Sequence, residues 1–185
     1  MKFSSSLILG RFQPIHIGHQ KLIDLALEVS NKVLVFVGSS DKPISKRNPF
    51  DAEYRIRLIE KIYEDEVSSG KLIVKPLPDL TDENDLTYRW GEYVVESAEK
   101  VLNENLECII YGKEQAISDC FSKDLLENIT EIGISRNQMT ISATKLREYI
   151  INGDIDNFKK YTSSKIHNQY EYLRSILIDI NKKEM

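Results

Sequence analysis

The sequence predicts an α/β protein with a doubly wound parallel sheet, because short apolar runs alternate along the chain with longer stretches of helical periodicity. The run Val-Leu-Val-Phe-Val-Gly at 33–38 is apolar at consecutive positions, which is typical of a strand buried on both faces of a parallel sheet. Ligands bind beyond the carboxyl ends of the strands in such sheets, so we expect the functional loops to follow strands.

Each expected element rests on a local pattern. A first apolar run at 7–9 leads into a helix over about 16–30, whose apolar residues recur at helical spacing. After the strand at 33–38, Asp51 is placed to cap a helix that runs to about Tyr63. The remaining expected elements are a strand at 72–74, a helix over about 88–103, a strand at 108–111, a short helix near 119–126, a strand around 129–132, and a helix entered at 140–147 that stops at Gly153. We expect one domain over residues 1–185, with a helical tail from about residue 154.

Composition narrows the classes of function. The 185 residues carry a formal net charge of −4, which argues against general nucleic-acid binding and favours a small-molecule partner. Cys108 and Cys120 lie in a strand-like run and a helical segment, and we expect them to be reduced thiols of a cytoplasmic protein. No run approaches the roughly 18 apolar residues of a membrane helix, so no membrane partner is expected. We expect a homo-oligomer.

The stretch Gly-Arg-Phe-Gln-Pro-Ile-His-Ile-Gly-His at 10–19 joins a strand to a helix start, where free backbone N–H groups and the positive end of the helix favour a phosphate. His16 and His19 are three residues apart, so their rings should face the same ligand and remain reachable by solvent. Gly18 should let that ligand approach the backbone. Two alternatives are surface histidines and a chance metal pair. A zinc site has no cysteine nearby and its next histidine is His167, and the glycines do not form the dinucleotide pattern G-x-G-x-x-G.

These residues resemble the nucleotidyltransferase superfamily marked by (His/Thr)-x-Gly-His, and more narrowly the archaeal-type nicotinamide mononucleotide (NMN) adenylyltransferases. The resemblance implies a Rossmann-like nucleotidyltransferase fold and an ATP site. A second match is Ile-Ser-Ala-Thr-x-x-Arg at 141–147, which is similar to the superfamily's triphosphate-binding signature, although a capping Ser or Thr alone is usually structural. The resemblance implies ATP contacts by Gly10, Arg11, Phe12, His16, Gly18, His19, Gly112, Lys113, Ile141, Ser142, Thr144 and Arg147.

The loop at 39–50 carries Lys42, Lys46 and Arg47 within six residues. A basic loop is usually a solvated surface, but a basic residue before Asn48, Pro49 and Phe50 resembles the family's NMN-side loop. The resemblance implies that Arg47 binds the acceptor phosphate, since a guanidinium grips two phosphate oxygens at once, and that Asn48 and Phe50 take part.

Trp90 is the only tryptophan, and it follows the third expected strand. It can be a core aromatic at a helix start or a flat face for a nicotinamide ring. The resemblance implies the second role. Relatives of the archaeal type carry an Asn three residues before this tryptophan, where the present chain has Thr87, which has no side-chain amide.

The resemblance implies adenylyl transfer from ATP to NMN, giving NAD and pyrophosphate by direct attack of the acceptor phosphate on the ATP α-phosphorus. His16, His19, Arg11 and Arg147 would be the catalytic residues. The sequence offers no evident set of carboxylates for a metal, so Mg²⁺ is expected to arrive with ATP. The alternatives are transfer to nicotinate mononucleotide, phosphopantetheine or a lipid head group, and a non-catalytic NAD or ATP sensor.

Overall fold

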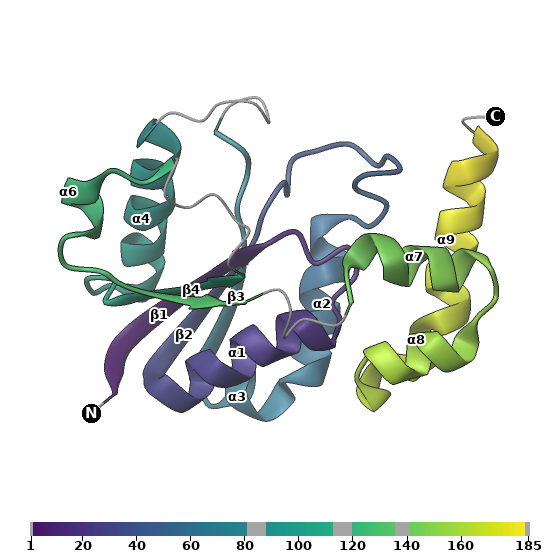
Figure 1. Cartoon of the computed structure of the whole chain (residues 1–185), viewed down its shortest axis with the longest axis horizontal. Coiled ribbons are helices and arrows are strands. Elements are labelled where there is room, and N and C mark those ends of the chain that lie inside the picture. The colour runs from purple at the N-terminus through teal and green to yellow at the C-terminus, as the bar shows by residue number, and fades with distance from the viewer. Residues whose placement is uncertain (1, 81–87, 113–119, 136–140, 184–185) are drawn as a thin grey trace.

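The computed structural model describes residues 2–80, 88–112, 120–135 and 141–183. Its five strands form one sheet in the order β3-β2-β1-β4-β5, and each neighbouring pair is parallel (Figure 1). The strands are β1 (Phe3–Gly10), β2 (Ser30–Val37), β3 (Leu72–Pro76), β4 (Cys108–Gly112) and β5 (Thr130–Ile134). The predicted doubly wound sheet is confirmed, and the strand order reverses between β1 and β4.

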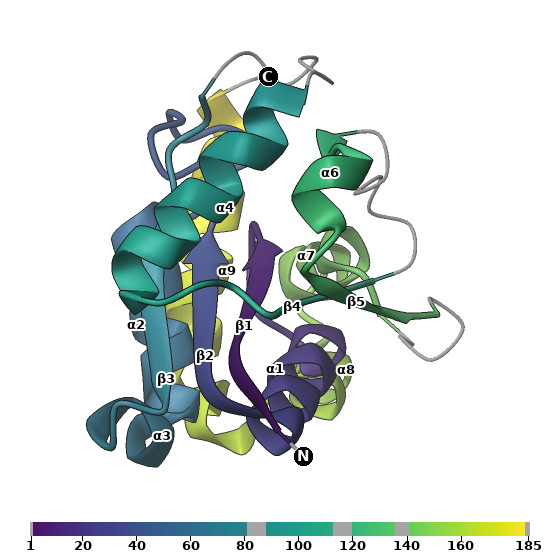
Figure 2. The same ribbon diagram turned by 90° about the vertical axis from the view of Figure 1, so that its left-hand side faces the viewer.

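Helices cover both faces of this sheet. One face packs against α1 (Ile17–Val29), α2 (Ala52–Ile62) and the C-terminal helices, and the other against α4 (Tyr88–Leu102), as Figure 2 shows. The other helices are α3 (Glu64–Ser68), α6 (Lys123–Leu126), α7 (Ala143–Ile151), α8 (Ile155–Tyr161), the 3₁₀ helix η2 (Ser164–Gln169) and α9 (Tyr170–Lys183).

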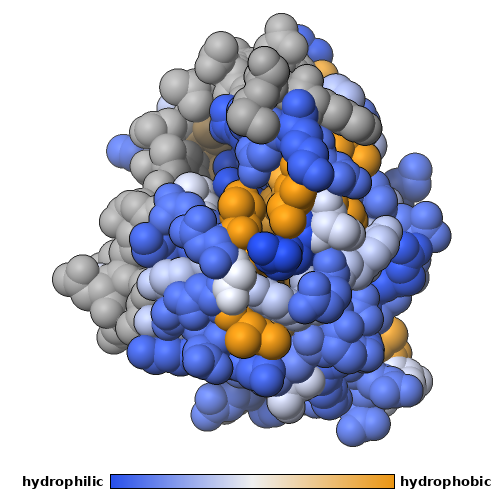
Figure 3. Space-filling model, turned by 90° about the vertical axis from the view of Figure 1, so that its right-hand side faces the viewer, coloured by the Kyte–Doolittle hydropathy of each residue, from blue (hydrophilic) through white to orange (hydrophobic). Residues whose placement is uncertain are grey.

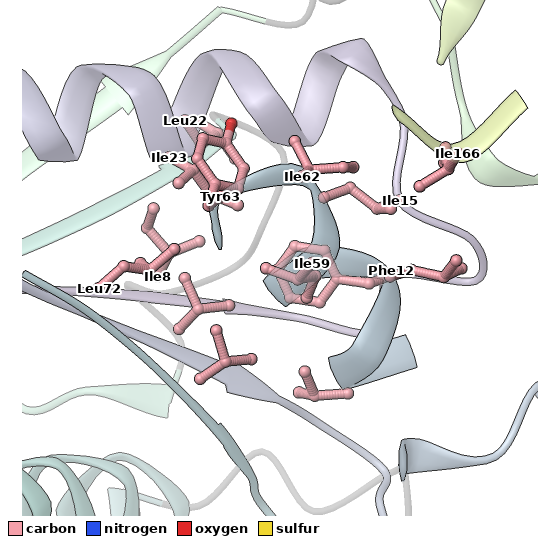
Figure 4. Close-up of a cluster of buried hydrophobic side chains, with 14 of the residues drawn as sticks. Ile8, Phe12, Ile15, Leu22, Ile23, Ile59, Ile62, Tyr63, Leu72 and Ile166 are labelled. Atoms are coloured by element: carbon pink, nitrogen blue, oxygen red, sulfur yellow. The ribbon is translucent and has the colours of Figure 1, made fainter. Parts of the chain in front are cut away.

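The larger hydrophobic cluster lies between β1, β2, α1 and α2 (Figure 4). Phe12 and Ile15, from the turn after β1, insert into it beside Ile59 of α2. Burial of their side chains anchors that turn to the sheet and to α2, because each removes a large apolar area from water. The turn therefore rests on a packed core.

The chain after Gly153 forms α8, η2 and α9, where we expected a helical tail. These helices gather at one end of the molecule beside α2 (Figure 1). Phe158, Leu173 and Leu177 are buried in the same cluster as α1 and α2. The face on this side of the molecule is mostly hydrophilic, with small apolar areas (Figure 3). None of the described helices is long and apolar enough to cross a membrane.

Most boundaries agree with the expected elements, and the exceptions have physical causes. β1 begins at Phe3, well before the apolar run, because Ser5 and Ser6 are completely buried in this central strand. The hydroxyl of Ser5 donates to the carbonyl of Asn105 at 3.0 Å, which satisfies the polar group inside the protein. The short helix α3 was not predicted, because its five residues give no helical period to read.

Candidate functional site

A cavity of about 420 Å³ opens at the carboxyl ends of β1 and β4, where the strand order reverses. Parallel sheets bind ligands at this point. Eleven of the predicted site residues line the cavity: Gly10, Arg11, Phe12, His16, His19, Arg47, Gly112, Ile141, Ser142, Thr144 and Arg147. The structure thus brings the two sequence signatures together on one cavity.

His16 is the N-cap of α1. Its backbone is extended, and its Nδ1 accepts hydrogen bonds from the amides of Gly18 at 3.1 Å and His19 at 3.4 Å. A cap of this kind satisfies N–H groups that have no partner within the helix. Because Nδ1 accepts, a neutral His16 carries its proton on Nε2 and can donate it to a ligand.

The His19 ring stacks on the His16 ring, with centroids 3.8 Å apart and planes 24° apart. The Phe12 ring packs against His19 from another direction at 4.7 Å. Both histidines line the same cavity. Their expected solvent access is wrong for His16, whose exposed fraction is only 5%.

Gly18 has a different role from the predicted one. A Cβ atom there would lie 2.9 Å from Cε1 of His16, closer than real Cβ contacts allow. Gly18 is absent from the described lining of the cavity. Glycine at this position therefore makes room for the His16 ring, which caps the helix.

Both histidines are neutral at pH 7. Burial lowers the pKa of His16 to about 4. Burial, and then the neighbouring His16, lower the pKa of His19 well below its ordinary value. The pair can therefore donate hydrogen bonds to an anion, whereas the positive charge of the site comes from arginines.

Arg147 extends from α7 to the turn after β1. One terminal nitrogen donates to the carbonyl of Gln13 at 2.8 Å, and the other donates to the Thr144 hydroxyl at 3.3 Å. Burial, and then Arg11, lower the Arg147 pKa, which places the two cations near each other. The Ser142 hydroxyl caps α7 by accepting from the amide of Lys145 at 3.2 Å. The cavity therefore combines three arginines, Arg11, Arg47 and Arg147, with the positive ends of two helices, which suits a polyphosphate.

The described residues show no built metal centre. No group of three or more His, Cys, Asp or Glu side chains in the described ranges could hold a metal ion, and the described lining of the cavity contains no carboxylate. Mg²⁺ prefers oxygen ligands and readily takes them from substrate phosphates and water.

The residues predicted for the acceptor divide into three groups. Arg47 lines the cavity, and Asn48 is buried with no hydrogen-bond partner for its Oδ1 among the described residues. The Phe50 ring is buried in the core, with its centroid 6.0 Å from that of the Tyr54 ring. The ring therefore packs inside the protein instead of making the predicted contact with the acceptor. Thr87 and Lys113 lie outside the described residues.

Trp90, in the first turn of α4, is partly buried against a smaller hydrophobic cluster on the side of the sheet that α4 covers. Its ring meets the Phe121 ring edge-on, with centroids 5.8 Å apart and planes at 85°. The geometry fits a core aromatic and leaves the stacking role as a prediction.

Sequence reasoning missed two buried polar residues at the cavity, each 2% exposed: Gln13, which lines it, and Arg55, which lies outside its lining. Gln13 lies within the stretch at 10–19, but the resemblance assigns no role to this glutamine. Arg55 follows the helix cap Asp51 by four residues and reads as a solvated position. Hydrogen bonds to distant main-chain groups, which no sequence pattern shows, distinguish both residues.

Comparison with known proteins agrees with this geometry. The family model described as cytidylyltransferase-like matches residues 7–165. The nicotinamide-nucleotide adenylyltransferase of Saccharolobus solfataricus is 26% identical over 183 residues, which cover 98% of this chain and 96% of that protein. The nicotinamide/nicotinic acid mononucleotide adenylyltransferase of Acinetobacter baylyi is 27% identical over 154 residues, covering 83% and 79% of the two chains.

The fold also resembles solved structures. A bifunctional NMN adenylyltransferase/ADP ribose pyrophosphatase from Francisella tularensis superposes with a TM-score of 0.75 at 25% identity. The match covers 98% of this chain and 54% of that one, so the chain spans about half the length of the bifunctional protein. A second structure of the same enzyme holds AMP and a manganese ion, with a TM-score of 0.71 at 24% identity.

Proposed function

We propose, from the premise that this chain belongs to the cytidylyltransferase-like family, that it transfers the adenylyl group of ATP to NMN and releases NAD and pyrophosphate. The observation that carries the proposal is the single cavity on which the histidine pair, Arg11 and Arg147 meet the N-terminus of α7. The names of its archaeal and bacterial relatives support the same reaction.

The reaction needs no protein nucleophile, since the acceptor is already a phosphate monoester. An oxygen of the NMN phosphate forms a bond to the α-phosphorus, and the bond from that phosphorus to the bridging oxygen of pyrophosphate breaks. Negative charge builds on the α-phosphate and on the leaving group. Nε2 of His16 can donate a hydrogen bond there, while Arg11 and Arg147 neutralise charge on the triphosphate.

Binding of the metal follows from the donors that the cavity offers. Because the described lining has no carboxylate, we propose that Mg²⁺ enters as the ATP complex and keeps water among its ligands. The bound ion would neutralise phosphate charge. The positive charge that the protein itself supplies would come from Arg11 and Arg147.

The acceptor would lie on the side of the 39–50 loop. Arg47 is proposed to bind its phosphate. Asn48, whose buried Oδ1 has no partner among the described residues, is proposed to take part in binding another group of the acceptor. An acceptor hydroxyl or amide could satisfy that oxygen. Trp90 is proposed to stack on the pyridine ring, with Thr87 nearby in the chain.

The decisive experiment measures pyrophosphate release from ATP and Mg²⁺ with a panel of acceptors: NMN, nicotinate mononucleotide, phosphopantetheine and no acceptor. We expect NMN to be the preferred acceptor, nicotinate mononucleotide to be used more slowly, and NAD to form in equal amount to pyrophosphate. The His19→Ala variant serves as the control for contaminating activity. The proposal would be overturned if pyrophosphate were released only when phosphopantetheine is the acceptor, or if no acceptor led to its release.

A further inference from the structure

Two segments must hold the two substrates of the proposed reaction in register. One is the phosphate turn, residues 10–16, which carries Arg11 and His16. The other is the acceptor loop, residues 39–50, which carries Arg47. Both segments contribute to the lining of the same cavity. Hydrogen bonds from buried side chains connect them at both ends of the acceptor loop.

Arg55 connects the phosphate turn to the start of the acceptor loop. One terminal nitrogen of its guanidinium donates to the carbonyls of Arg11 at 2.7 Å and Gly38 at 2.8 Å, and the other donates to the carbonyl of Ser39 at 3.2 Å. Its Nε donates to the carbonyl of Asp51, at the N-terminus of α2, at 3.2 Å. A single planar group thus fixes the ends of two strands and the start of a helix.

Ser39 is held in an unusual conformation at this point. Its φ is +48°, in the left-handed region that non-glycine residues rarely adopt. Its amide and hydroxyl both donate to Oδ1 of Asp79, at 3.2 and 3.3 Å, while its carbonyl accepts from Arg55. Hydrogen bonds on both sides of Ser39 therefore fix the direction in which the acceptor loop leaves β2. Strained backbone conformations of this kind cluster at functional sites.

Gln13 connects the phosphate turn to the end of the acceptor loop. Its Nε2 donates to the carbonyl of Phe50 at 3.0 Å, and its Oε1 accepts from the amide of Phe50 at 3.0 Å. The side-chain amide thus pairs with both main-chain groups of Phe50, its N–H and its C=O. The Phe50 ring is buried, which anchors this residue to the core.

Burial of Arg55 is expensive unless its charge is compensated. Burial lowers its pKa to about 10, so it is still a cation at pH 7. The compensation comes from main-chain carbonyls and from the more distant carboxylates of Asp51 and Asp79. An apolar residue would fill the same space without this cost, but it would leave the carbonyls unpaired and the two segments unconnected.

We propose that Arg55 and Gln13 are positioning residues that hold the acceptor loop against the phosphate turn, so that the acceptor phosphate lies in line with the α-phosphate of ATP. The inference rests on the proposed function. Arg55 lies outside the cavity lining, and Gln13, which lines the cavity, uses its side-chain amide to hold Phe50. Displacement of one reacting phosphate by about 1 Å lowers the rate of such a reaction about 100-fold, because alignment supplies much of the catalysis.

The test uses Arg55→Lys and Gln13→Met. The lysine keeps the positive charge but has a single nitrogen, so it cannot reach all four of the carbonyls that Arg55 binds. The methionine keeps the length of the glutamine side chain without its amide. We expect kcat for NAD formation to fall about 10- to 100-fold in each variant, and the KM for ATP to stay within about twofold.

Tyr63→Phe is the matched control. The Tyr63 hydroxyl donates to Asp24 at 2.7 Å and lies 3.3 Å from the carbonyl of Gln20, so it also connects two elements from a buried position, but outside the cavity lining. We expect this variant to lower the melting temperature as the other two do and to keep its kcat. Normal kcat in Arg55→Lys and Gln13→Met, or an equal loss in Tyr63→Phe, would overturn the proposal.

Amide hydrogen exchange separates this inference from the proposed reaction. We expect peptides covering 39–50 to exchange faster in Arg55→Lys and Gln13→Met than in the wild type, without any substrate. If wild-type protein makes no NAD but the loop still loses protection in both variants, the proposed reaction fails and the connection stands. Unchanged exchange in both variants overturns the connection, whatever the reaction.

Discussion

Replacing His16 with asparagine should leave the stability of the protein nearly unchanged and remove most of its activity. The two ring nitrogens of His16 have different tasks. Nδ1 accepts from the amides of Gly18 and His19, and the Oδ1 of an asparagine reaches a similar position in one of the most favourable N-caps. The Nε2 hydrogen, which is proposed to reach the α-phosphate, has no counterpart on the shorter side chain.

The magnitudes separate the two tasks. His16→Ala removes the cap and the donor, so unfolding should become easier by about 0.5–2 kcal/mol. A loss of 1 kcal/mol lowers the melting temperature of a chain of this size by about 2–4 °C. Turnover should fall about 10²–10³-fold in both variants, because the lost hydrogen bond acts on charge that develops in the transition state.

The assay pairs thermal unfolding, followed by circular dichroism, with pyrophosphate release at saturating ATP and NMN. His19→Ala is the control, since it removes a stacked ring but leaves the cap acceptor in place. Normal turnover in His16→Asn would show that His16 is only a helix cap. Equal melting of the wild type and His16→Ala would refute the capping account.

The lowered pKa of His16 predicts a pH effect, because the unfolded chain binds a proton at this residue below about pH 6.5 and the folded protein only near pH 4. The free energy of unfolding should therefore be highest above pH 7 and fall as the pH drops from about 6.5 to about 4. Urea unfolding at pH 7 and pH 5 measures it, and the fall should be smaller in His16→Asn. Arg47→Ala should raise the KM for NMN about 10- to 100-fold and that for ATP little, and Arg147→Ala the reverse; equal effects on both substrates would contradict the assignment of the two arginines. Saturation with NMN should change the fluorescence of Trp90 and ATP should change it much less, and an unchanged signal would remove Trp90 from the site.

The architecture was predictable because the signals for it are local. Consecutive apolar residues at 33–38 predict a strand buried on both faces, and β2 has that burial. The start of β1 was not predictable, since Ser5 and Ser6 are polar and owe their burial to strands on both sides. That burial depends on the order of the strands, which the sequence does not state.

The site residues, too, were predictable where the signal is local and unpredictable where it depends on distant contacts. Motifs with fixed spacing placed His16, His19 and Arg147 correctly on the cavity. Composition alone could not rank the cations of the acceptor loop. Lys42 forms an ion pair with Asp79 at 3.7 Å, whereas Arg47 lines the cavity. The difference arises from the direction in which the loop leaves Ser39, and this direction is set by contacts with residues 40 positions later in the chain.

The hydrogen bond from Arg147 to the carbonyl of Gln13 explains why two motifs about 125 residues apart can act as one site. It joins α7 to the phosphate turn, and the side chain of Gln13 joins that turn to Phe50 at the end of the acceptor loop. The triphosphate and acceptor sides are therefore linked through a single residue, but by different groups of it. Arg147→Ala removes the contact to the carbonyl and leaves the amide pair intact, so the acceptor loop should keep its position. This separation is the reason to expect Arg147→Ala to weaken ATP binding selectively, while Gln13→Met disturbs alignment with little effect on the KM for ATP.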